Sequence, residues 1–312
     1  MRWRWIAIIG ACVCLHLSFC LLYDAIPWER RELMYRIVPS FDRFYMNQAF
    51  DFWRMWDRLG WTGRDVSGEY VGDLSDAFYV GGEPRGEMPI EVLSNRAFCV
   101  GYSAKWKSPL WVAYRLDRVE DFKWGRRTSS FRVERRVNER VSAQAFSGSG
   151  YDRGHMAPNF GIATRYGREA QLETFVMSNV IAQRPWLNRG IWRRLEVDVA
   201  RTYAQQEERI WILTGPIFSA GSITLDSGAR VPDACFKICV DRTRDHIRVM
   251  AFIMEQSIPP YTRLRERLVS VDEIEAATGI DFFTALSMET ETALEAEVAT
   301  RLWPGVGPLV WF

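Results

Sequence analysis

The chain has 312 residues, of which 48% are hydrophobic and 25% are charged, a composition typical of a globular protein with a sizeable core. Its net charge of +1 excludes a global polycation, so affinity for an anionic partner has to come from local clusters of charge. Only three histidines are present, which excludes most zinc sites, because these usually need several His or Cys ligands.

The N-terminus begins with a long apolar run. Residues 5–23, WIAIIGACVCLHLSFCLLY, hold no Asp, Glu, Lys or Arg and are about long enough to span a bilayer as a helix. We therefore expect residues 1–23 to be an uncleaved transmembrane anchor. A cleavable signal peptide is the alternative, although no clear A-x-A site follows the run. Arginines lie on both sides of it, so the positive-inside rule does not give the orientation.

Residues 24–90 resemble a juxtamembrane connector. The segment 45–61 has apolar residues at helical spacing and predicts a short helix, packed on the domain or, as the alternative, lying on the membrane surface. Residues 66–89 are rich in glycine and acidic residues, which is typical of a linker.

From residue 91 the pattern becomes that of a mixed α and β domain. Short apolar runs between turns predict strands at 97–103, 110–116, 209–215, 235–240 and 247–254. A helical period predicts a helix over 188–206, and a second helix is expected at 271–279, where Gly279 closes it. We expect one α+β domain over residues 91–290 and a C-terminal tail over 291–312.

The three cysteines of this domain form no metal pattern. Cys235 and Cys239 lie four residues apart on an expected strand, roughly 13 Å at strand rise, so they cannot bridge each other. A bridge from Cys99 to one of them stays open, but buried free thiols are the favoured interpretation.

The tetrad DRGH at 152–155 holds the one histidine whose surroundings suggest chemistry. His155 titrates near neutral pH and can take a proton from water, while Arg153 carries a planar fork suited to phosphate oxygens. Gly154 permits close approach of the backbone, and Asp152 can hold Arg153 or cap a turn. Arginine beside histidine, without zinc ligands, suits cleavage of a phosphate ester. A solvated turn with a hydrogen-bonded histidine is the structural alternative.

The segment 177–196, MSNVIAQRPWLNRGIWRRLE, adds candidates for a metal site. On one continuous helix, Asn188 and Glu196 lie about 12 Å apart along the axis, so both can border a site without gripping the same small ion. A neutral amide oxygen suits Mg²⁺, which keeps most of its waters, and Glu196 would hold one of those waters. Alternatively, Asn188 caps the helix and Glu196 is an exposed helix charge.

Basic residues surround these motifs. The segment 123–140 carries seven Lys or Arg against two Glu, and further arginines flank the proposed metal site: Arg184, Arg189, Arg193 and Arg194. Such clusters fit a phosphodiester backbone that is recognised by charge rather than by base. For any single arginine a solvated surface is the simpler interpretation.

Together, the motifs resemble the DNA/RNA non-specific endonuclease family, whose members have a ββα-metal active site, and its endonuclease G-like branch in particular. DRGH is followed about thirty residues on by Ser-Asn at 178–179 and then by the pattern N-x-G-x-W-x-x-L-E at 188–196. Further stretches agree: PLWVAYRL at 109–116, LTGPIF at 213–218, PDACFKI at 232–238 and SVDEIEAATGIDFF at 270–283. The resemblance covers residues 91–290 and leaves out the first ninety.

The resemblance implies a role for each matching residue. His155 is the general base that activates water, and Arg153 contacts phosphate. Asn188 is the direct protein ligand to a catalytic Mg²⁺, with Mn²⁺ as an alternative ion, and Glu196 orients metal-bound water. Asn179 supports the site through hydrogen bonds.

The sequence departs from the family pattern at two places. Ala182 stands where the family often has proline, but Gln183 is kept, so we expect a local backbone effect only and count Gln183 and Asp152 as supporting residues. The family's upstream arginine has several candidates here, of which Arg132, directly after Phe131, fits best. The arginines expected to bind nucleic acid are Arg132, Arg127, Arg184 and Arg189.

The sequence therefore predicts a Mg²⁺-dependent endonuclease of DNA and RNA that leaves 5′-phosphates, with a ββα-metal fold and a central antiparallel sheet flanked by helices. We expect it to be anchored through residues 5–23 with the domain in the periplasm or at the cell surface; secretion and the mitochondrial intermembrane space are alternatives. Dimerisation is common in the family, so a homodimer is an option. The competing functions are a non-catalytic nucleic-acid-binding or uptake module and a phosphodiesterase of small substrates.

Overall fold

The computed structural model describes residues 64–69, 78–122, 130–226, 228–242, 246–259 and 262–303, together with isolated positions before residue 49. The predicted span at 5–23 and the predicted helix at 45–61 lie outside the described residues, except for isolated position 48, and so does Arg127. Within the described ranges, no helix combines the length and the apolar character that crossing a membrane requires.

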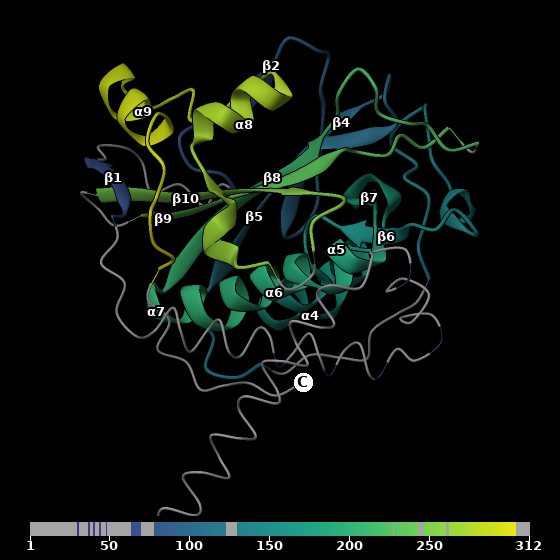
Figure 1. Ribbon diagram of the computed structural model, residues 1–312, viewed down its shortest axis with the longest axis horizontal. Coiled ribbons are helices and arrows are strands. Elements are labelled where there is room, and N and C mark those ends of the chain that lie inside the picture. Colours follow the sequence, from purple (N-terminus) through teal and green to yellow (C-terminus); the bar gives the residue numbers. More distant parts are fainter. Residues whose placement is uncertain are drawn as a thin grey trace, which may run out of the picture.

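A central antiparallel sheet organises the molecule, as predicted (Figure 1). Its strand order is β1–β10–β9–β8–β5–β4–β3, and β11 also pairs with β10. All five predicted strands are present. The sheet strands are β1 (Val66–Glu69), β3 (Glu91–Ser94), β4 (Phe98–Ser103), β5 (Ser108–Asp117), β8 (Arg209–Ile217), β9 (Ala234–Arg242), β10 (His246–Glu255) and β11 (Leu268–Val269).

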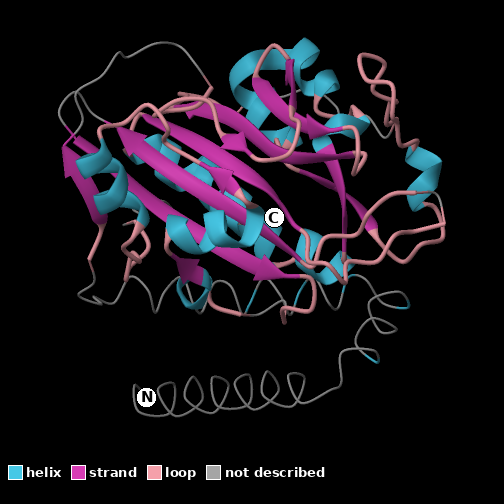
Figure 2. Ribbon diagram, turned by 90° about the horizontal axis from the view of Figure 1, so that it is seen from above, coloured by secondary structure: helices cyan, strands magenta, loops and turns pink. Residues whose placement is uncertain are grey.

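Helices cover both faces of this sheet (Figures 1 and 2). On one face lie α4 (Asn159–Glu173), α5 (Pro185–Arg189), α6 (Ile191–Asp198) and α7 (Ala204–Gln206), and on the other α8 (Val271–Thr278) and α9 (Met288–Glu295). Because both faces are covered, the central strands are apolar on both sides, and β9 is buried at every position. Short helical turns complete the chain: η1 (Ala143–Phe146), η2 (Met177–Asn179), the π-turn η3 (Val199–Tyr203) and η4 (Leu264–Arg267).

Two small two-stranded sheets lie apart from the main sheet. Strand β6 (Asp152–His155) pairs with β7 (Val180–Gln183), and β2 (Arg85–Gly86) pairs with β12 (Ile280–Asp281), both antiparallel. The β6–β7 pair is followed at once by α5 and α6, so the chain forms a ββα unit at the DRGH motif.

The helix expected over 188–206 is interrupted. Gly190, with φ −98° and ψ −119°, ends α5 and starts α6, and the π-turn η3 separates α6 from α7. The expectation that Asn188 and Glu196 share one continuous helix is therefore wrong, because a non-helical residue lies between them. The helix at 271–279 is confirmed: Ser270 and Glu273 form a capping box, and Gly279 closes it at φ 68°.

The folded unit extends on both sides of residues 91–290. Within the predicted connector, β1 forms an edge of the sheet beside β10, and β2 pairs with β12. Beyond residue 290, α9 packs on β1 and Trp303 is buried. The three cysteines are buried free thiols, as expected: Cys99, Cys235 and Cys239.

Candidate active site

The ββα unit brings the predicted residues of two distant motifs together. The register pairs Asp152 with Gln183 and His155 with Val180, so the DRGH strand lies directly beside the segment that follows Ser178-Asn179. Successive side chains of a strand point to opposite faces, which places Arg153 and His155 on one face of β6 and Asp152 on the other.

The imidazole of His155 is held by aromatic rings. It is 9% exposed, and its ring centre lies 5.3 Å from that of Phe131 and 4.8 Å from that of Phe175, the latter edge-on. Arg153 stacks on the same Phe131 ring at 5.6 Å, and its Nε and Nη2 donate to the carbonyl of Ala143 at 2.9 and 2.7 Å. Phe131 thus links the candidate base to the candidate phosphate-binding arginine.

Asn179 fixes the chain immediately after His155. Its fully buried amide donates through Nδ2 to the carbonyls of Ala157 at 3.0 Å and Thr174 at 2.9 Å, and its Oδ1 accepts from the amide of Ala157 at 2.8 Å. Because these bonds all go to main-chain atoms, the amide of Asn179 positions the backbone and is committed to that task.

Asp152 orients the side chain of Asn188. The Nδ2 of Asn188 donates to Asp152 at 2.9 Å, and Arg189 donates to both oxygens of the same carboxylate at 2.6 and 2.5 Å. Burial lowers the pKa of the Arg189 guanidinium. A carboxylate only accepts hydrogen bonds, so the NH₂ of Asn188 has to face it and the amide oxygen points elsewhere. An amide oxygen held in this way fits a hard cation such as Mg²⁺.

Gln183, the supporting residue on β7, packs against Gly154 of β6. A Cβ on Gly154 would lie 2.0 Å from Oε1 of the fully buried Gln183, so only glycine leaves room for this glutamine. Gln256 holds the end of β7: it donates to the carbonyl of Ala182 and accepts from the amide of Arg184, each at 2.7 Å. No motif of the sequence pointed to Gln256.

Glu196 lies on α6 and faces a buried lysine. Lys237, in the middle of β9, is fully buried, with Nζ 4.4 Å from the ring centre of Trp192 and 3.4 Å from the hydroxyl of Tyr114. Burial lowers the pKa of Lys237, and Glu196 is the strongest of the charges that oppose this. Glu196 is therefore near enough to Lys237 for their charges to interact, and it is only partly exposed. The signal for Lys237 was a single lysine inside the apolar run 235–240.

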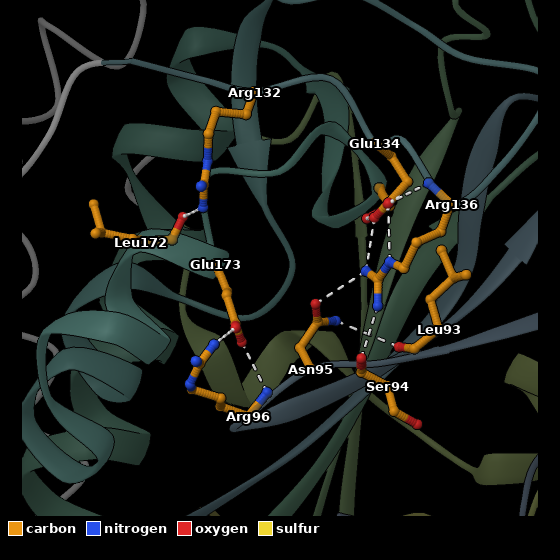
Figure 3. Close-up of polar contacts among 10 residues, drawn as sticks. Leu93, Ser94, Asn95, Arg96, Arg132, Glu134, Arg136, Leu172 and Glu173 are labelled. Carbon is orange, nitrogen blue, oxygen red and sulfur yellow. Dashed lines mark hydrogen bonds and ion pairs between the residues drawn. The ribbon is translucent and has the colours of Figure 1, made fainter.

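Two arginines of the basic segment make different contacts (Figure 3). Arg132 donates to the carbonyl of Leu172 at 2.8 Å, at the end of α4. Arg136 donates to Glu134, to the carbonyl of Ser94 at 2.7 Å and to Asn95 at 3.0 Å. Arg136 thus joins the segment of Glu134 to the end of β3, whereas Arg132 forms a hydrogen bond to the C-terminal end of α4. Arg184, directly after β7, lies 5.8 Å from the ring centre of Tyr151.

Glu134 connects Arg136 to the segment before β7. It is 5% exposed and accepts from Ser178 at 2.8 Å, one residue before Asn179. Burial opposes ionisation of this carboxyl, but the hydrogen bonds from Arg136 and Ser178 outweigh burial and lower its pKa to about 2.

With this geometry in view, comparison with known proteins decides the family. The model of the DNA/RNA non-specific endonuclease family matches residues 85–289, more than half of the chain. The chain belongs to the DNA/RNA non-specific endonuclease family. It is therefore an endonuclease, a hydrolase of nucleic acids.

Curated relatives agree with this membership, and a solved structure has a similar fold. A nuclease of Nostoc sp. is 30% identical over 239 residues, 70% of this chain and 84% of that protein. The mitochondrial nuclease EXOG of Danio rerio is 29% identical over 210 residues, 61% of this chain but only 60% of that protein. The fold is similar to a chain in a crystal structure of an EndoG/EndoGI complex, with a TM-score of 0.57, 23% identity, and coverage of 64% of this chain and 88% of that one.

Proposed function

We propose that this endonuclease cleaves phosphodiester bonds of both DNA and RNA with His155 as general base and leaves 5′-phosphate ends. The observation that carries the proposal is the ββα unit, in which Asp152 turns the amide oxygen of Asn188 outward while Phe131 holds His155 beside Arg153. An enzyme of this kind needs a proton acceptor, a phosphate-binding cation and a metal ligand. In the proposal, β6 supplies the first two and α5 supplies the third.

Each side chain has a distinct task in this proposal. His155 takes the proton of the attacking water, and Arg153 binds a phosphate oxygen and keeps the phosphodiester beside the histidine. Asn188 would hold Mg²⁺, or Mn²⁺ in its place, through its amide oxygen, and Glu196 would hold it through water. When bound, the ion supplies positive charge for the developing phosphorane charge and the leaving 3′ oxygen.

The surrounding residues prepare the site for a polymer. Asn179 fixes the loop after His155, and Gln183 packs against Gly154 of β6. Arg132 and Arg184 supply positive charge around the β6–β7 pair, and Arg189 is paired with Asp152. All three are the proposed contacts to the nucleic-acid backbone, recognised without regard to base. Arg127, outside the described residues, is proposed as a further contact.

We also place this activity outside the cytoplasm, because a nuclease without sequence preference would attack the cell's own nucleic acid. The apolar run at 5–23 supports a membrane anchor, with the domain in the periplasm or at the cell surface. A relative named as mitochondrial is consistent with the mitochondrial alternative, for which the intermembrane space is our expectation. Assembly as a homodimer stays an expectation.

The test compares the wild-type chain, purified in detergent, with His155→Ala and with His246→Ala as the matched control. His246 is an exposed histidine at the start of β10, in the central sheet rather than in the β6–β7 pair. Supercoiled plasmid and RNA are incubated in Mg²⁺ and in EDTA. We expect metal-dependent cleavage of both polymers, reduced by about 10²- to 10⁴-fold in His155→Ala and unchanged in the control.

Two other outcomes identify the competing functions. A wild-type chain that binds both polymers but cuts neither would make this protein a binding module. Cleavage of a dinucleotide at a rate equal to that of plasmid would make it a phosphodiesterase of small substrates.

A further inference from the structure

A lysine is buried in the central sheet, in contact with helix α6. Lys237 lies in the middle of β9, is fully buried, and belongs to a strand that is buried at every position. Its neighbours two residues away on the same face of β9 are Cys235 and Cys239, and burial raises the pKa of each thiol to about 12. Both thiols therefore stay neutral, so the ammonium group receives no opposite charge from its own strand.

The uncharged groups around Lys237 do not explain why a charge is kept there. Its Nζ donates to the hydroxyl of Tyr114 at 3.4 Å and lies 4.4 Å from the ring centre of Trp192. Burial holds the pKa of Tyr114 well above its ordinary value, so this phenol is neutral too. Removing an ammonium group from water is costly, and an apolar side chain of similar volume would avoid that cost. A lysine at this position therefore calls for a negatively charged counterpart.

Glu196 is that counterpart. Trp192 and Glu196 are four residues apart on α6, so they are neighbours on one face of the helix, about one turn apart. Because the ring of Trp192 lies against the ammonium group, this face of α6 is the one that meets Lys237. The electrostatics agree with this placement, since Glu196 is the strongest of the charges that act on Lys237 and also of those that act on Tyr114.

The two charged groups differ in what they can reach. Glu196 is partly exposed, whereas Lys237 has no exposed surface, so the lysine cannot touch nucleic acid or a metal ion. A glutamate side chain has several rotamers, and a charge fixed in the sheet favours those that keep the carboxylate near it. Lys237 can therefore act on the site only through Glu196.

We propose that Lys237 is a positioning residue, whose buried ammonium group holds the carboxylate of Glu196 in place for metal-bound water. The inference rests on the proposed function, in which Glu196 holds the metal ion through water. Partners that orient the groups around a metal ion strengthen binding of the ion, because those groups are already in place when the ion arrives. The strand β9 thus contributes to the site from inside the sheet, although it supplies no residue to the ββα unit.

The same arrangement couples the two charges in the stability of the fold. Removing the ammonium group alone leaves a partly buried carboxylate beside an apolar side chain, which is strongly unfavourable. Removing both charges together avoids this penalty. The effects of substitutions at Lys237 and Glu196 should therefore not add.

The test is a double-mutant cycle in the full chain, purified in detergent. The variants are Lys237→Met, which removes the charge at similar volume, Glu196→Gln, and the two combined. Cleavage of supercoiled plasmid is measured over a Mg²⁺ titration. We expect each single variant to raise the Mg²⁺ concentration for half-maximal cleavage by about 10- to 100-fold, and the double variant to equal Glu196→Gln within about twofold. Lys105→Met, at an exposed lysine in the turn between β4 and β5, is the matched control and should keep the wild-type Mg²⁺ dependence.

Urea unfolding in EDTA supplies a readout that involves neither metal nor nucleic acid. Lys237→Met should lower the unfolding midpoint, and adding Glu196→Gln to it should recover at least part of the loss. If Lys237→Met is too unstable for the cleavage assay, the double variant and Glu196→Gln remain the comparison that decides.

Three results would overturn the inference. They are a wild-type Mg²⁺ dependence in Lys237→Met, a Mg²⁺ requirement of the double variant equal to the product of the two single effects, and midpoint shifts that simply add. Each of these, obtained with an active wild-type enzyme, removes the positioning role alone. A wild-type chain that cleaves neither DNA nor RNA removes the proposed function, and the positioning role with it.

Discussion

Gly154, which has no side chain, leaves room for Gln183 in the β6–β7 pair. In Gly154→Ala the new Cβ would lie 2.0 Å from Oε1 and 2.5 Å from Cδ of Gln183, which is fully buried. We expect the free energy of unfolding to fall by about 1–3 kcal/mol, because overpacking displaces the glutamine. Urea unfolding measures the change.

The matched control for this substitution is Gly221→Ala. The nearest atom to a Cβ at Gly221 is Oγ of Ser219 at 3.8 Å, an ordinary contact, and we expect its unfolding midpoint to equal that of the wild type. A Gly154→Ala chain with an unchanged midpoint would show that Gln183 moves without loss and that the close approach is unimportant.

In the proposed mechanism, Asp152 acts on catalysis through Asn188. In Asp152→Asn the acceptor-only carboxylate becomes an amide, which no longer dictates which end of Asn188 faces it and no longer neutralises Arg189. We expect the Mg²⁺ concentration for half-maximal cleavage to rise about 10- to 100-fold, the usual effect of removing a hydrogen-bond partner of a metal ligand. Cleavage rates over a Mg²⁺ titration measure it.

Glu255→Gln serves as the control for Asp152→Asn, because it also neutralises one acid, in an ion pair with Arg267 at 3.3 Å that is largely exposed. Its Mg²⁺ dependence should equal that of the wild type. If Asp152→Asn matches it, Asn188 is oriented by something other than this carboxylate.

At the scale of elements, the apolar strands were the most predictable part of the fold. Runs such as 235–240 and 247–254 are buried on both faces, so composition alone marks them. Helix α4 was missed, because its sequence is polar on average and Gly167, at φ 78°, interrupts its period. The break at Gly190 was missed for a related reason: the apolar stripe continues across it while the backbone does not.

Motifs predicted which segments lie together better than periodicity predicted the backbone between them. Order and spacing placed His155, Asn179 and Asn188 in one unit, and the β6–β7 pairing followed by α5 brings their segments together. The residues that hold this unit were not predictable, since Gln256 and Glu134 act through contacts between segments far apart in the sequence. Such contacts leave no local pattern.

The hydrogen bonds that Glu134 accepts from Arg136 and Ser178 make the link between the basic segment and η2 dependent on pH. The folded-state pKa of Glu134, about 2, lies below its ordinary value of 4.5, so its contribution to stability is present above pH 4.5 and is lost as the pH falls toward 2. The shift corresponds to a contribution on the order of 3 kcal/mol. Urea unfolding at pH 7, 4 and 3 should show a loss in the wild type that is smaller in Glu134→Gln.

Glu297→Gln is the control for the pH series, because Glu297 forms an exposed pair with Arg64 at 3.6 Å. Its pH dependence should parallel that of the wild type. Equal slopes for Glu134→Gln and the wild type would locate the acid sensitivity in other carboxyls.

At the scale of the whole molecule, the sheet is completed by segments that the sequence assigned to a connector and a tail. The edge strand β1 pairs with β10 over Val66–Glu69, and Asp65 accepts from Arg301 at 2.9 Å, which joins the two ends of the folded unit. Val66 and Val80, both 3% exposed, belong to the core cluster. A glycine-rich and acidic composition concealed these contacts, because only a few apolar residues carry them.

The boundary of the folded unit is therefore testable with two fragments, 64–312 and 91–312, neither of which contains the predicted anchor. The shorter one loses Val66 and Val80 from the core and leaves part of the β10 edge unpaired. At about 1.5–3 kcal/mol for each buried side chain, we expect its free energy of unfolding to be lower by about 3–6 kcal/mol, and the open edge should make it prone to aggregation. Urea unfolding and light scattering measure the two effects; equal midpoints would mean that residues 64–90 are a connector that contributes nothing to the fold.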